Sequence, residues 1–444
     1  MKKPLPLHGI LGIVLLFLSE IFLFRKVDPF YSWFYCFAWW SYILIVDAVI
    51  YHLKGNSLLL TRTKEFFLMI PWSLFIWLIF EAANLILENW YYINLPDATI
   101  ERWSGYAIAY GTVLPGIFET TELLETLGLF KNSKMKRMIV SGEGHIILAL
   151  LGLLWLLSSV NIPETFFPLI WVGFILLLDP INYRLGGRSL LRDLEEGNPR
   201  KIYLLLIAGL ICGFLWEFWN FWAFSKWVYT VPFFERVKGF EMPFLGFLGF
   251  PPFAVQVYVM YNTLSLFRHK RGWEETTYQL HIEKKSSRLT VILTAVLIAS
   301  FSVLIFRAID LKTVDSYEPH LKDAYWIEPK YREMLPKVGI ANFEEVVSKT
   351  REKKECEELA LRLLVPKEDL IRWVEYAKLA QIKGLGIDNL RLLEQVGVHS
   401  VTVLAGEDPD SLYEKMLHLQ RIKPNLRKAK IRIWIREAQR KVKN

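Results

Sequence analysis

Two copies of one polar motif, each set beside apolar sequence, constrain the fold of this chain most. The first copy reads Asp47, Tyr51, Gly55 and Ser57, and the second reads Asp179, Tyr183, Gly187 and Ser189 in the same register. Farther along, the pair Glu81 and Asn84 likewise returns as Glu217 and Asn220. An ionised carboxylate is costly inside a bilayer, so acidic residues in apolar segments indicate functional sites. The matched positions therefore predict an internally duplicated membrane protein with a symmetric polar centre.

The composition also indicates a membrane protein. Of the 444 residues, 53% are hydrophobic and 15% are aromatic, which is more than a soluble chain of this length usually carries. Nine segments are long enough to cross a hydrocarbon core, which needs about 20 apolar residues. We place them at 7–24, 31–52, 66–88, 104–127, 144–160, 165–183, 202–224, 243–267 and 289–306. Pro115 in the fourth and Pro251-Pro252 in the eighth leave open that one of these segments re-enters instead of crossing.

Along the membrane region, loops that are rich in lysine and arginine alternate with loops that are poor in them. The positive-inside rule then places the N-terminus and the basic loops in the cytoplasm of a prokaryotic cell. Nine crossings of this plasma membrane leave the C-terminal region outside the cytoplasm. The net charge of +8 thus reflects topology rather than a nucleic-acid-binding face. The three cysteines show no spacing that indicates a disulfide framework or a zinc site.

The predicted fold class is all-α. We expect five parts: membrane repeat 1 of four helices at 1–137, membrane repeat 2 of four helices at 138–275, a ninth transmembrane helix at 276–310, a linker at 311–330, and a soluble helical domain at 331–444. Each repeat has an even number of crossings, so both share one orientation. They should be related by an axis along the membrane normal, as in parallel-repeat carriers.

The first matched pair of polar residues lies at the cytoplasmic end of its helix. Asp47 and Tyr51 are four residues apart and share a helix face, as do Asp179 and Tyr183. One interpretation is an interfacial anchor, with tyrosine at the headgroups and aspartate paired with a loop arginine. The other is a polar gate at the cytoplasmic mouth of a cavity.

The second matched pair lies deeper, in the outward half of its helix. Glu81 and Asn84 share a face, as do Glu217 and Asn220, and we expect these faces to point away from lipid. They form either a structural lock across the axis or a substrate or proton site, in which burial allows a carboxyl group to act as an acid.

The two halves differ at one position. Glu119 follows Pro115 by four residues, whereas Gln256 follows Pro252 by four, so a carboxylate corresponds to an amide. A catalytic or ion-coupled site often needs such an asymmetry, because two neighbouring carboxylates perturb each other. Sequence drift explains the difference equally well.

Aromatic residues are concentrated at the outward ends of the predicted helices. Most of them indicate an interfacial belt. Trp216 and Trp219 flank Glu217 and could instead line a pocket for a flat or isoprenoid-like ligand. The sequence has no glycine-rich phosphate loop, no histidine-rich di-iron motif and no paired aspartate motif. We therefore predict no metal site and no cofactor.

Beyond residue 331 the pattern changes to short amphipathic helices joined by tight turns. The stretches from Trp373 to Gly386 and from Asp408 to Lys415 resemble tandem helix-hairpin-helix modules. More closely, this region resembles an uncharacterised helix-hairpin-helix-like domain of unknown function from bacteria and archaea. The resemblance covers a quarter of the chain and none of the membrane part, and it implies a fold without a settled activity.

The resemblance also indicates a hairpin turn at Gly384 and Gly386. In DNA-binding relatives this turn offers backbone N–H groups to a phosphate. Here acidic residues such as Glu394 interrupt the basic surface, and the predicted location is outside the cytoplasm, so nucleic acid is disfavoured. We expect a protein partner, or self-association, through residues 331–444.

Three classes of function remain for the whole chain. The first is a carrier or binding protein for a small or amphiphilic substrate, with Glu81, Glu119 and Glu217 as binding or coupling groups. The second is an intramembrane enzyme that acts on an isoprenoid or lipid by carboxyl acid–base chemistry. The third is a membrane scaffold whose C-terminal domain recruits partners. Matched carboxylates favour the carrier, which we place first.

Overall fold

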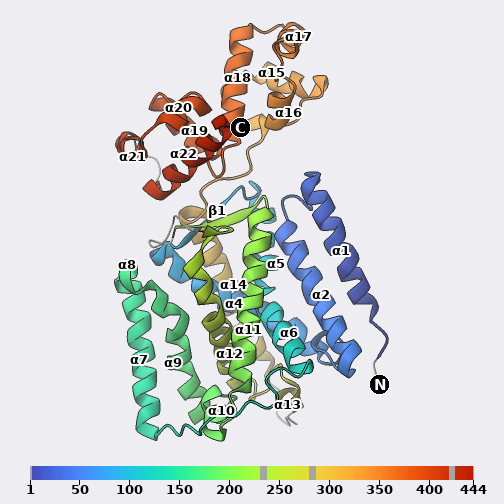
Figure 1. Cartoon of the computed structure of the whole chain (residues 1–444), viewed down its shortest axis with the longest axis vertical. Helices are drawn as coiled ribbons and strands as arrows, with labels where there is room; N and C mark the ends of the chain where they lie inside the picture. The colour runs from blue at the N-terminus through green and yellow to red at the C-terminus, as the bar shows by residue number, and fades with distance from the viewer. Residues whose placement is uncertain (1–2, 231–237, 280–286, 420–425, 444) are drawn as a thin grey trace. The chain divides into compact units, whose positions relative to one another are not determined.

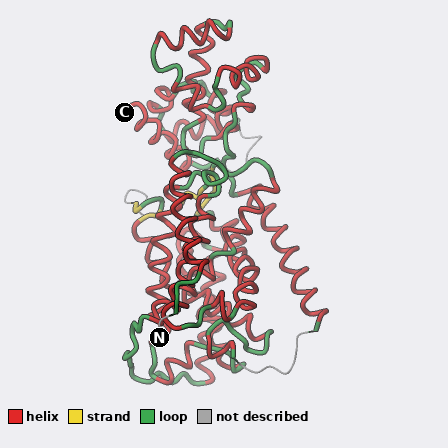
Figure 2. Tube along the Cα trace, turned by 90° about the vertical axis from the view of Figure 1, so that its right-hand side faces the viewer, coloured by secondary structure: helices red, strands yellow, loops and turns green. Residues whose placement is uncertain are grey.

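A computed structural model describes residues 3–230, 238–279, 287–419 and 426–443. Most of these residues are helical, as Figure 2 shows, and the predicted all-α fold is confirmed. The chain divides into two compact units. The membrane unit comprises Met1–Trp90, Ile100–Phe224 and Val228–Asp310, and the C-terminal unit comprises Tyr91–Thr99, Ser225–Trp227 and Leu311–Asn444. Residues 231–237 of the predicted second repeat and 280–286 ahead of the predicted ninth helix lie outside the described residues.

Eight of the described helices are long and apolar enough to cross a membrane, which indicates a membrane protein. They are α1 (Leu7–Phe24), α2 (Phe34–Lys54), α4 (Thr63–Leu87), α7 (Gly142–Asn161), α9 (Ile170–Arg184), α11 (Arg200–Trp222), α12 (Phe250–Leu266) and α14 (Arg288–Lys312). Short helical turns extend α9 and α12 at their N-terminal ends: α8 (Pro163–Phe166) and η1 (Phe167–Leu169) before α9, and η2 (Phe244–Gly249) before α12.

The fourth segment that was predicted to cross the membrane, 104–127, is not one helix, so the prediction of a single continuous helix is wrong. Residues 104–127 fall in two shorter helices, α5 (Thr99–Tyr110) and α6 (Val113–Thr126). Pro115 has no N–H to continue the helical ladder. Ser73 of α4 bridges the break, since its hydroxyl donates to Tyr110 O at 2.6 Å and accepts from Leu114 N at 3.0 Å.

The broken pair still covers the length of the unit. Near the start of α5, Arg102 is paired with Asp310 of α14 at 2.8 Å. Near the end of α6, Glu122 is paired at 2.8 Å with Lys54, the last residue of α2. The α5–α6 pair therefore runs from the C-terminal end of α14 to the C-terminal end of α2, as a crossing helix would.

Small residues let the outer helices pack closely. Gly12 of α1 faces the Ser41 carbonyl of α2, where an added Cβ would lie at 2.9 Å. Gly152 of α7 faces the Gly173 carbonyl of α9, where it would lie at 2.7 Å. Glycine at such contacts allows two backbones to approach inside a membrane. Figure 1 shows these two helix pairs on either side of α4, α11 and α12.

Short elements connect the long helices. They are α3 (Leu58–Thr61), α10 (Leu190–Glu196), α13 (Glu275–Tyr278), β1 (Trp90–Ile93), β2 (Lys226–Tyr229), β3 (Lys238–Gly239) and β4 (Met242–Pro243). Strand β1 pairs with β2, and β3 pairs with β4 in an antiparallel hairpin.

The C-terminal unit is a bundle of short helices around one apolar core. The elements are η3 (Leu321–Asp323), α15 (Pro329–Met334), η4 (Leu335–Val338), α16 (Phe343–Ser348), α17 (Lys353–Leu363), α18 (Lys367–Ala380), α19 (Gly386–Gln395), α20 (Val401–Gly406), α21 (Pro409–His418) and α22 (Lys428–Lys443). Trp373 of α18, Leu390 of α19 and Trp434 of α22 are buried in that core.

Residues 311–330, predicted as a linker, instead belong to this unit. Thr313 O accepts a hydrogen bond from Tyr92 N, and Tyr92 O accepts one from Asp315 N, both at 2.8 Å. Farther on, Leu321 and Trp326 are buried in the core. A segment that completes a backbone ladder and contributes core residues packs as a part of this unit.

Candidate functional site in a buried polar layer

The matched aspartates Asp47 and Asp179 hold the short helices that follow them. Asp47 accepts hydrogen bonds from Ser57 Oγ at 2.9 Å and from Leu59 N at 2.7 Å, at the start of α3. Asp179 accepts them from Ser189 Oγ at 3.0 Å and from the N–H of Leu191 at 2.8 Å, at the start of α10. A carboxylate that satisfies free N–H groups at a helix start is stabilising. Both aspartates therefore have a structural role in the turn.

Further contacts of the Asp–Tyr pairs involve residues outside the repeated motif. Instead of a loop arginine, His8 of α1 approaches Asp47, with Nε2 3.0 Å from Oδ1. In the second half of the chain, the Tyr183 hydroxyl donates to Glu195 at 2.6 Å. Tyr51, the equivalent tyrosine of the first half, is half-buried. The His8 contact was not expected from the sequence, because a single histidine near the start of an apolar helix gives no spacing signal.

Glu81 and Asn84 fix the turn after α4. Glu81 Oε1 accepts from Trp77 Nε1 at 2.9 Å and from Trp90 Nε1 at 3.2 Å. The Asn84 side chain donates to Trp90 O at 2.9 Å and accepts from Asn89 N at 2.9 Å. These bonds tie the helix to the strand that follows it.

Glu217 holds its own following strand in a similar way, accepting from the Tyr229 hydroxyl at 2.9 Å. Asn220 is fully buried one turn later. Trp77 is a donor to Glu81 and Tyr229 is a donor to Glu217, so each of these bonds lies within one half of the chain.

Aromatic rings fill the space where the two halves meet. Trp216 lies 5.6 Å from Trp77 and 5.8 Å from Phe253 between ring centroids. Trp219 lies 5.2 Å from Trp39. Edge-to-face and tilted packing at these separations is favourable between aromatic rings. Trp216 and Trp219, predicted as pocket residues, therefore contribute to a packed aromatic core.

Glu119 and Gln256 differ from all the other matched polar residues. Both side chains are fully buried, on α6 and α12 respectively. Neither oxygen of Glu119 and neither polar atom of Gln256 has a hydrogen-bond partner among the described residues. Buried polar groups are nearly always paired, so such exceptions need a chemical explanation. This pair is the strongest candidate for a functional site in the membrane unit.

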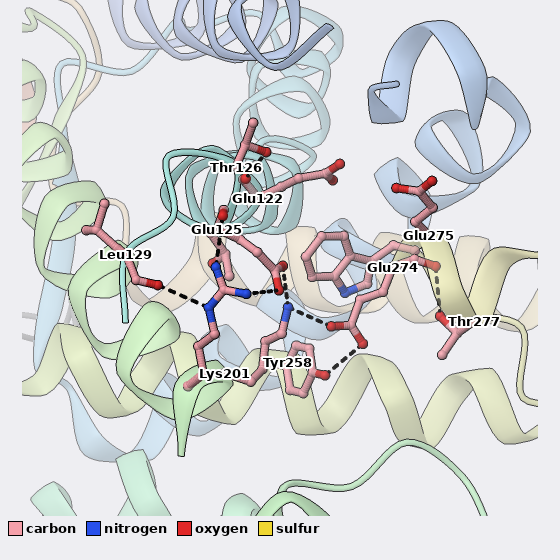
Figure 3. Close-up of polar contacts among 12 residues, drawn as sticks. Glu122, Glu125, Thr126, Leu129, Lys201, Tyr258, Glu274, Glu275 and Thr277 are labelled. Carbon is pink, nitrogen blue, oxygen red and sulfur yellow. Dashed lines mark hydrogen bonds and ion pairs between the residues drawn. The ribbon is translucent and has the colours of Figure 1, made fainter. Parts of the chain in front are cut away.

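A layer of buried ion pairs lies at the ends of α6, α11 and α12 (Figure 3). Lys201 Nζ lies 2.8 Å from both Glu125 Oε2 and Glu274 Oε1. Glu274 Oε2 also accepts from Tyr258 OH at 2.9 Å and from Arg188 Nε at 3.1 Å. Burial alone would raise the pKa of Glu274, but the Lys201 and Arg188 cations lower it to about 2. Glu274 is therefore ionised near neutral pH.

A second group of ion pairs continues this layer. Arg62 is buried and pairs with Glu122, and its guanidinium also donates to Trp273 O. Glu65 at the start of α4 pairs with Arg268, which follows α12. These residues were not predicted as a site, because Arg62, Glu65 and Arg268 resemble ordinary charges at helix ends and Glu122 has no matched partner in the repeat. The available signal was the spacing of Glu122 and Glu119, which are three residues apart and close together on α6.

The turn at Gly384 and Gly386 in the C-terminal unit is covered by protein. Gly384 and Gly386 have positive φ angles of 71° and 65°, which glycine adopts most easily. A Cβ added to Gly384 would lie 2.9 Å from Ile93 Cγ2, and one added to Gly386 would lie 2.7 Å from Ser316 Cβ. The backbone of this turn therefore packs against other residues of the unit.

Residues 326–441 match the family model described as a domain of unknown function, DUF4332. This match confirms the predicted uncharacterised C-terminal domain and begins a few residues before the predicted boundary. Comparisons with curated proteins and with solved structures found no match for the chain.

Proposed function

We propose that the membrane unit is a carrier or binding protein for a small or amphiphilic molecule, with Glu119 as its binding or coupling group. The observation that carries this proposal is the fully buried Glu119, whose two oxygens have no donor among the described residues. The other acidic residues of the matched motifs have structural bonds of their own. An intramembrane carboxyl group without such a bond is available to a solute or an ion.

The proposal includes two parallel repeats. The equivalent bonds made by Asp47 and Asp179 support it, because the two halves use the same turn chemistry. Strands β1 and β2 follow equivalent helices and pair with each other. Bonds from Thr230 N to Asn89 O and from Ser225 Oγ to Asn94 O flank the two strands and indicate that they run antiparallel. A twofold axis through equivalent segments produces such a pair.

Two ion pairs link the proposed repeats at their basic ends. Lys201 at the start of α11 pairs with Glu125 near the end of α6. Glu65 at the start of α4 pairs with Arg268, just beyond the end of α12. Both contacts join the start of one long helix (α11, or its equivalent α4) to the end of a helix in the other half (α6, or its equivalent α12). The start of α11 carries the cation, whereas the start of α4 carries the carboxylate. In a parallel-repeat carrier, contacts of this kind would close one side of the path and break when that side opens.

The proposed topology counts α5 and α6 together as one crossing. With α14 as the ninth, the N-terminus and the basic loops are cytoplasmic and the C-terminal unit is extracytoplasmic, in the plasma membrane of a prokaryotic cell. Within the C-terminal unit, protein already covers the Gly384 turn, where a nucleic-acid phosphate would have to bind. This cover favours a protein partner or self-association for residues 331–444.

The carrier proposal can be tested by native mass spectrometry and organic extraction of the full chain, purified in mild detergent. We expect wild type to retain a small molecule that Glu119→Gln loses. Glu196→Gln is the matched control, because Glu196 is exposed and the chemical change is the same. Equal occupancy in Glu119→Gln and wild type, or a ligand in neither protein, would contradict the proposal.

The intramembrane-enzyme alternative has less support, because aromatic rings occupy the region beside Glu217 where a flat substrate was expected. The scaffold alternative differs in what it predicts for Glu119. A scaffold would tolerate Glu119→Gln without the loss of any bound molecule, so the same experiment separates it from a carrier.

A further inference from the structure

We infer that Asp47 and Glu119 hold a single proton between them and that His8 connects this pair to water. This inference rests on the proposed function, and it makes the proton the ion to which the bound solute is coupled. Three features of the molecule support it: the contacts between α2 and α6, the oxygens of Glu119, which are unpaired among the described residues, and the partial exposure of His8.

Contacts on either side place Asp47 beside Glu119. The Tyr42 hydroxyl of α2 lies 2.8 Å from Thr120 Oγ1 of α6, and Lys54 Nζ of α2 lies 2.8 Å from Glu122 Oε1 of α6. Asp47 lies between Tyr42 and Lys54 on α2, and Glu119 adjoins Thr120 on α6. These contacts bring the two carboxyl groups together between α2 and α6.

A proton satisfies both carboxyl groups at once. Asp47 already accepts from Ser57 Oγ and Leu59 N, which suits an ionised carboxylate. Glu119 has no donor, so an ionised carboxylate at this position would be buried without compensation. When Glu119 carries a proton, its hydroxyl donates to Asp47, and one hydrogen bond pairs the two groups.

The surrounding charges are committed to other partners. The titratable and charged groups near Glu119 are Asp47 and Tyr42 on α2, Glu122 on α6, Cys212 on α11 and Arg62 before α4. Arg62 is bonded to Glu122 and to Trp273 O. The guanidinium that acts on Glu119 is therefore occupied by another carboxylate, which leaves a proton, held on Glu119 or supplied through His8, as the neutralising charge for the Asp47–Glu119 pair.

His8 provides the connection to water. Its Nε2 lies 3.0 Å from Asp47 Oδ1, and its side chain is 16% exposed, whereas that of Asp47 is 0% exposed. A proton taken from water by His8 passes to Asp47 and then to Glu119, and release runs in the opposite order.

A solute that competes for Glu119 must offer a positive charge or hydrogen-bond donors. The solute class is therefore a cationic or donor-bearing molecule.

The second half of the chain contains an internal comparison. Gln256 occupies the position equivalent to Glu119 and is equally buried without a partner among the described residues. An amide cannot take up and release a proton under physiological conditions. Only the first half is therefore able to carry the proton, and Glu119→Gln gives both halves the same chemistry.

Infrared spectroscopy of the full chain in lipid nanodiscs tests this inference. We expect wild type at neutral pH to show the carbonyl band of a protonated carboxylic acid, which Glu119→Gln loses and the exposed control Glu196→Gln retains. His8→Gln should retain the band but slow the hydrogen–deuterium exchange of that proton on the order of a hundredfold, as expected for a lost proton-transfer group. Circular dichroism confirms that each variant folds.

The inference and the proposed function fail in different ways. A wild-type spectrum without the band, or a band that persists in Glu119→Gln, would overturn the shared proton even if a small molecule still copurifies. A carboxylate band that responds to NaCl at constant pH, without a protonated band, would assign Na⁺ instead and overturn it too. The band with no copurified molecule would support the proton pair and contradict the carrier.

Discussion

The ammonium group of Lys201 lies 2.8 Å from Oε1 of Glu274, in a buried part of the membrane unit. Arg188 holds the other oxygen of the same carboxylate at 3.1 Å. Glu274 therefore neutralises two cations that come from different segments of the chain. Removing one partner of a buried pair leaves charge uncompensated and is more damaging than losing a surface pair.

Replacing Glu274 with Gln should lower the free energy of unfolding by about 3 kcal/mol, because Lys201 and Arg188 lose their shared partner. The measurement is reversible denaturation in detergent, followed by tryptophan fluorescence. Glu275→Gln is the control, since Glu275 is 45% exposed and lies 3.5 Å from Lys54. We expect it to cost less than 1 kcal/mol, as exposed pairs do. Equal losses in the two variants would contradict this account of the layer.

The contribution of Glu274 should also depend on pH. Its pKa is about 2 in the folded protein, against an ordinary value of 4.5. The stabilisation is then fully present above pH 4.5 and is lost as the pH falls from 4.5 towards 2. The difference in unfolding free energy between wild type and Glu274→Gln, measured across this range, should shrink on acidification. A difference that grows in acid would reverse the assigned sign.

The hydrogen bonds from Ser57 to Asp47 and from Ser189 to Asp179 should stabilise the fold by similar free energies. Ser57→Ala and Ser189→Ala each remove a hydroxyl that donates to the matched aspartate, and each should cost about 1 kcal/mol of stability. Chemical denaturation of the two single variants gives the comparison. A large loss in one half with none in the other would argue against equivalent turns, and so against the proposed duplication.

Gly384→Ala should destabilise the C-terminal unit more than Gly397→Ala does. Both glycines have a positive φ, so both variants incur backbone strain of about 1 kcal/mol. Only Gly384 also has a neighbour in the way, since its Cβ would lie 2.9 Å from Ile93, whereas nothing lies within 4 Å of Gly397. Hydrogen exchange in the C-terminal unit measures the difference. Equal effects would show that Ile93 does not contact the turn.

Cysteine labelling tests the proposed topology. Cys356 is only 7% exposed, so the native residue is a poor target. Leu364 is 84% exposed, and Leu364→Cys should react with a membrane-impermeant maleimide in intact spheroplasts. Wild type, whose three cysteines are all buried, is the control for background labelling. Labelling that appears only after lysis would place the C-terminal unit in the cytoplasm.

The sequence predicts those features of this fold that local chemistry determines. Long apolar runs indicate the crossing helices, and the two glycines at positions 384 and 386 indicate the turn. The break between α5 and α6 needs Ser73 from another helix to satisfy the freed backbone groups, which no local pattern shows. The ladder at Thr313 likewise depends on a distant partner, Tyr92.

The candidate site was predictable only in part. Glu119 and Gln256 emerge from comparison of the two halves, because they differ where neighbouring positions agree. The structural roles of Asp47 and Glu81 do not emerge from the sequence, because a sequence does not show which hydrogen-bond donors a carboxylate meets in the fold. The ion pairs of Glu274 lie between segments far apart in the chain, so their partners become visible only in three dimensions.

A density map of the full chain in lipid nanodiscs, compared with that of Glu119→Gln, tests the central claim most directly. The account predicts an ordered non-protein feature against the Glu119 carboxyl group in wild type, and its absence from the variant with the helices unmoved. Protein side chains that fill the same space in both maps, with no other feature beside Glu119, would contradict it.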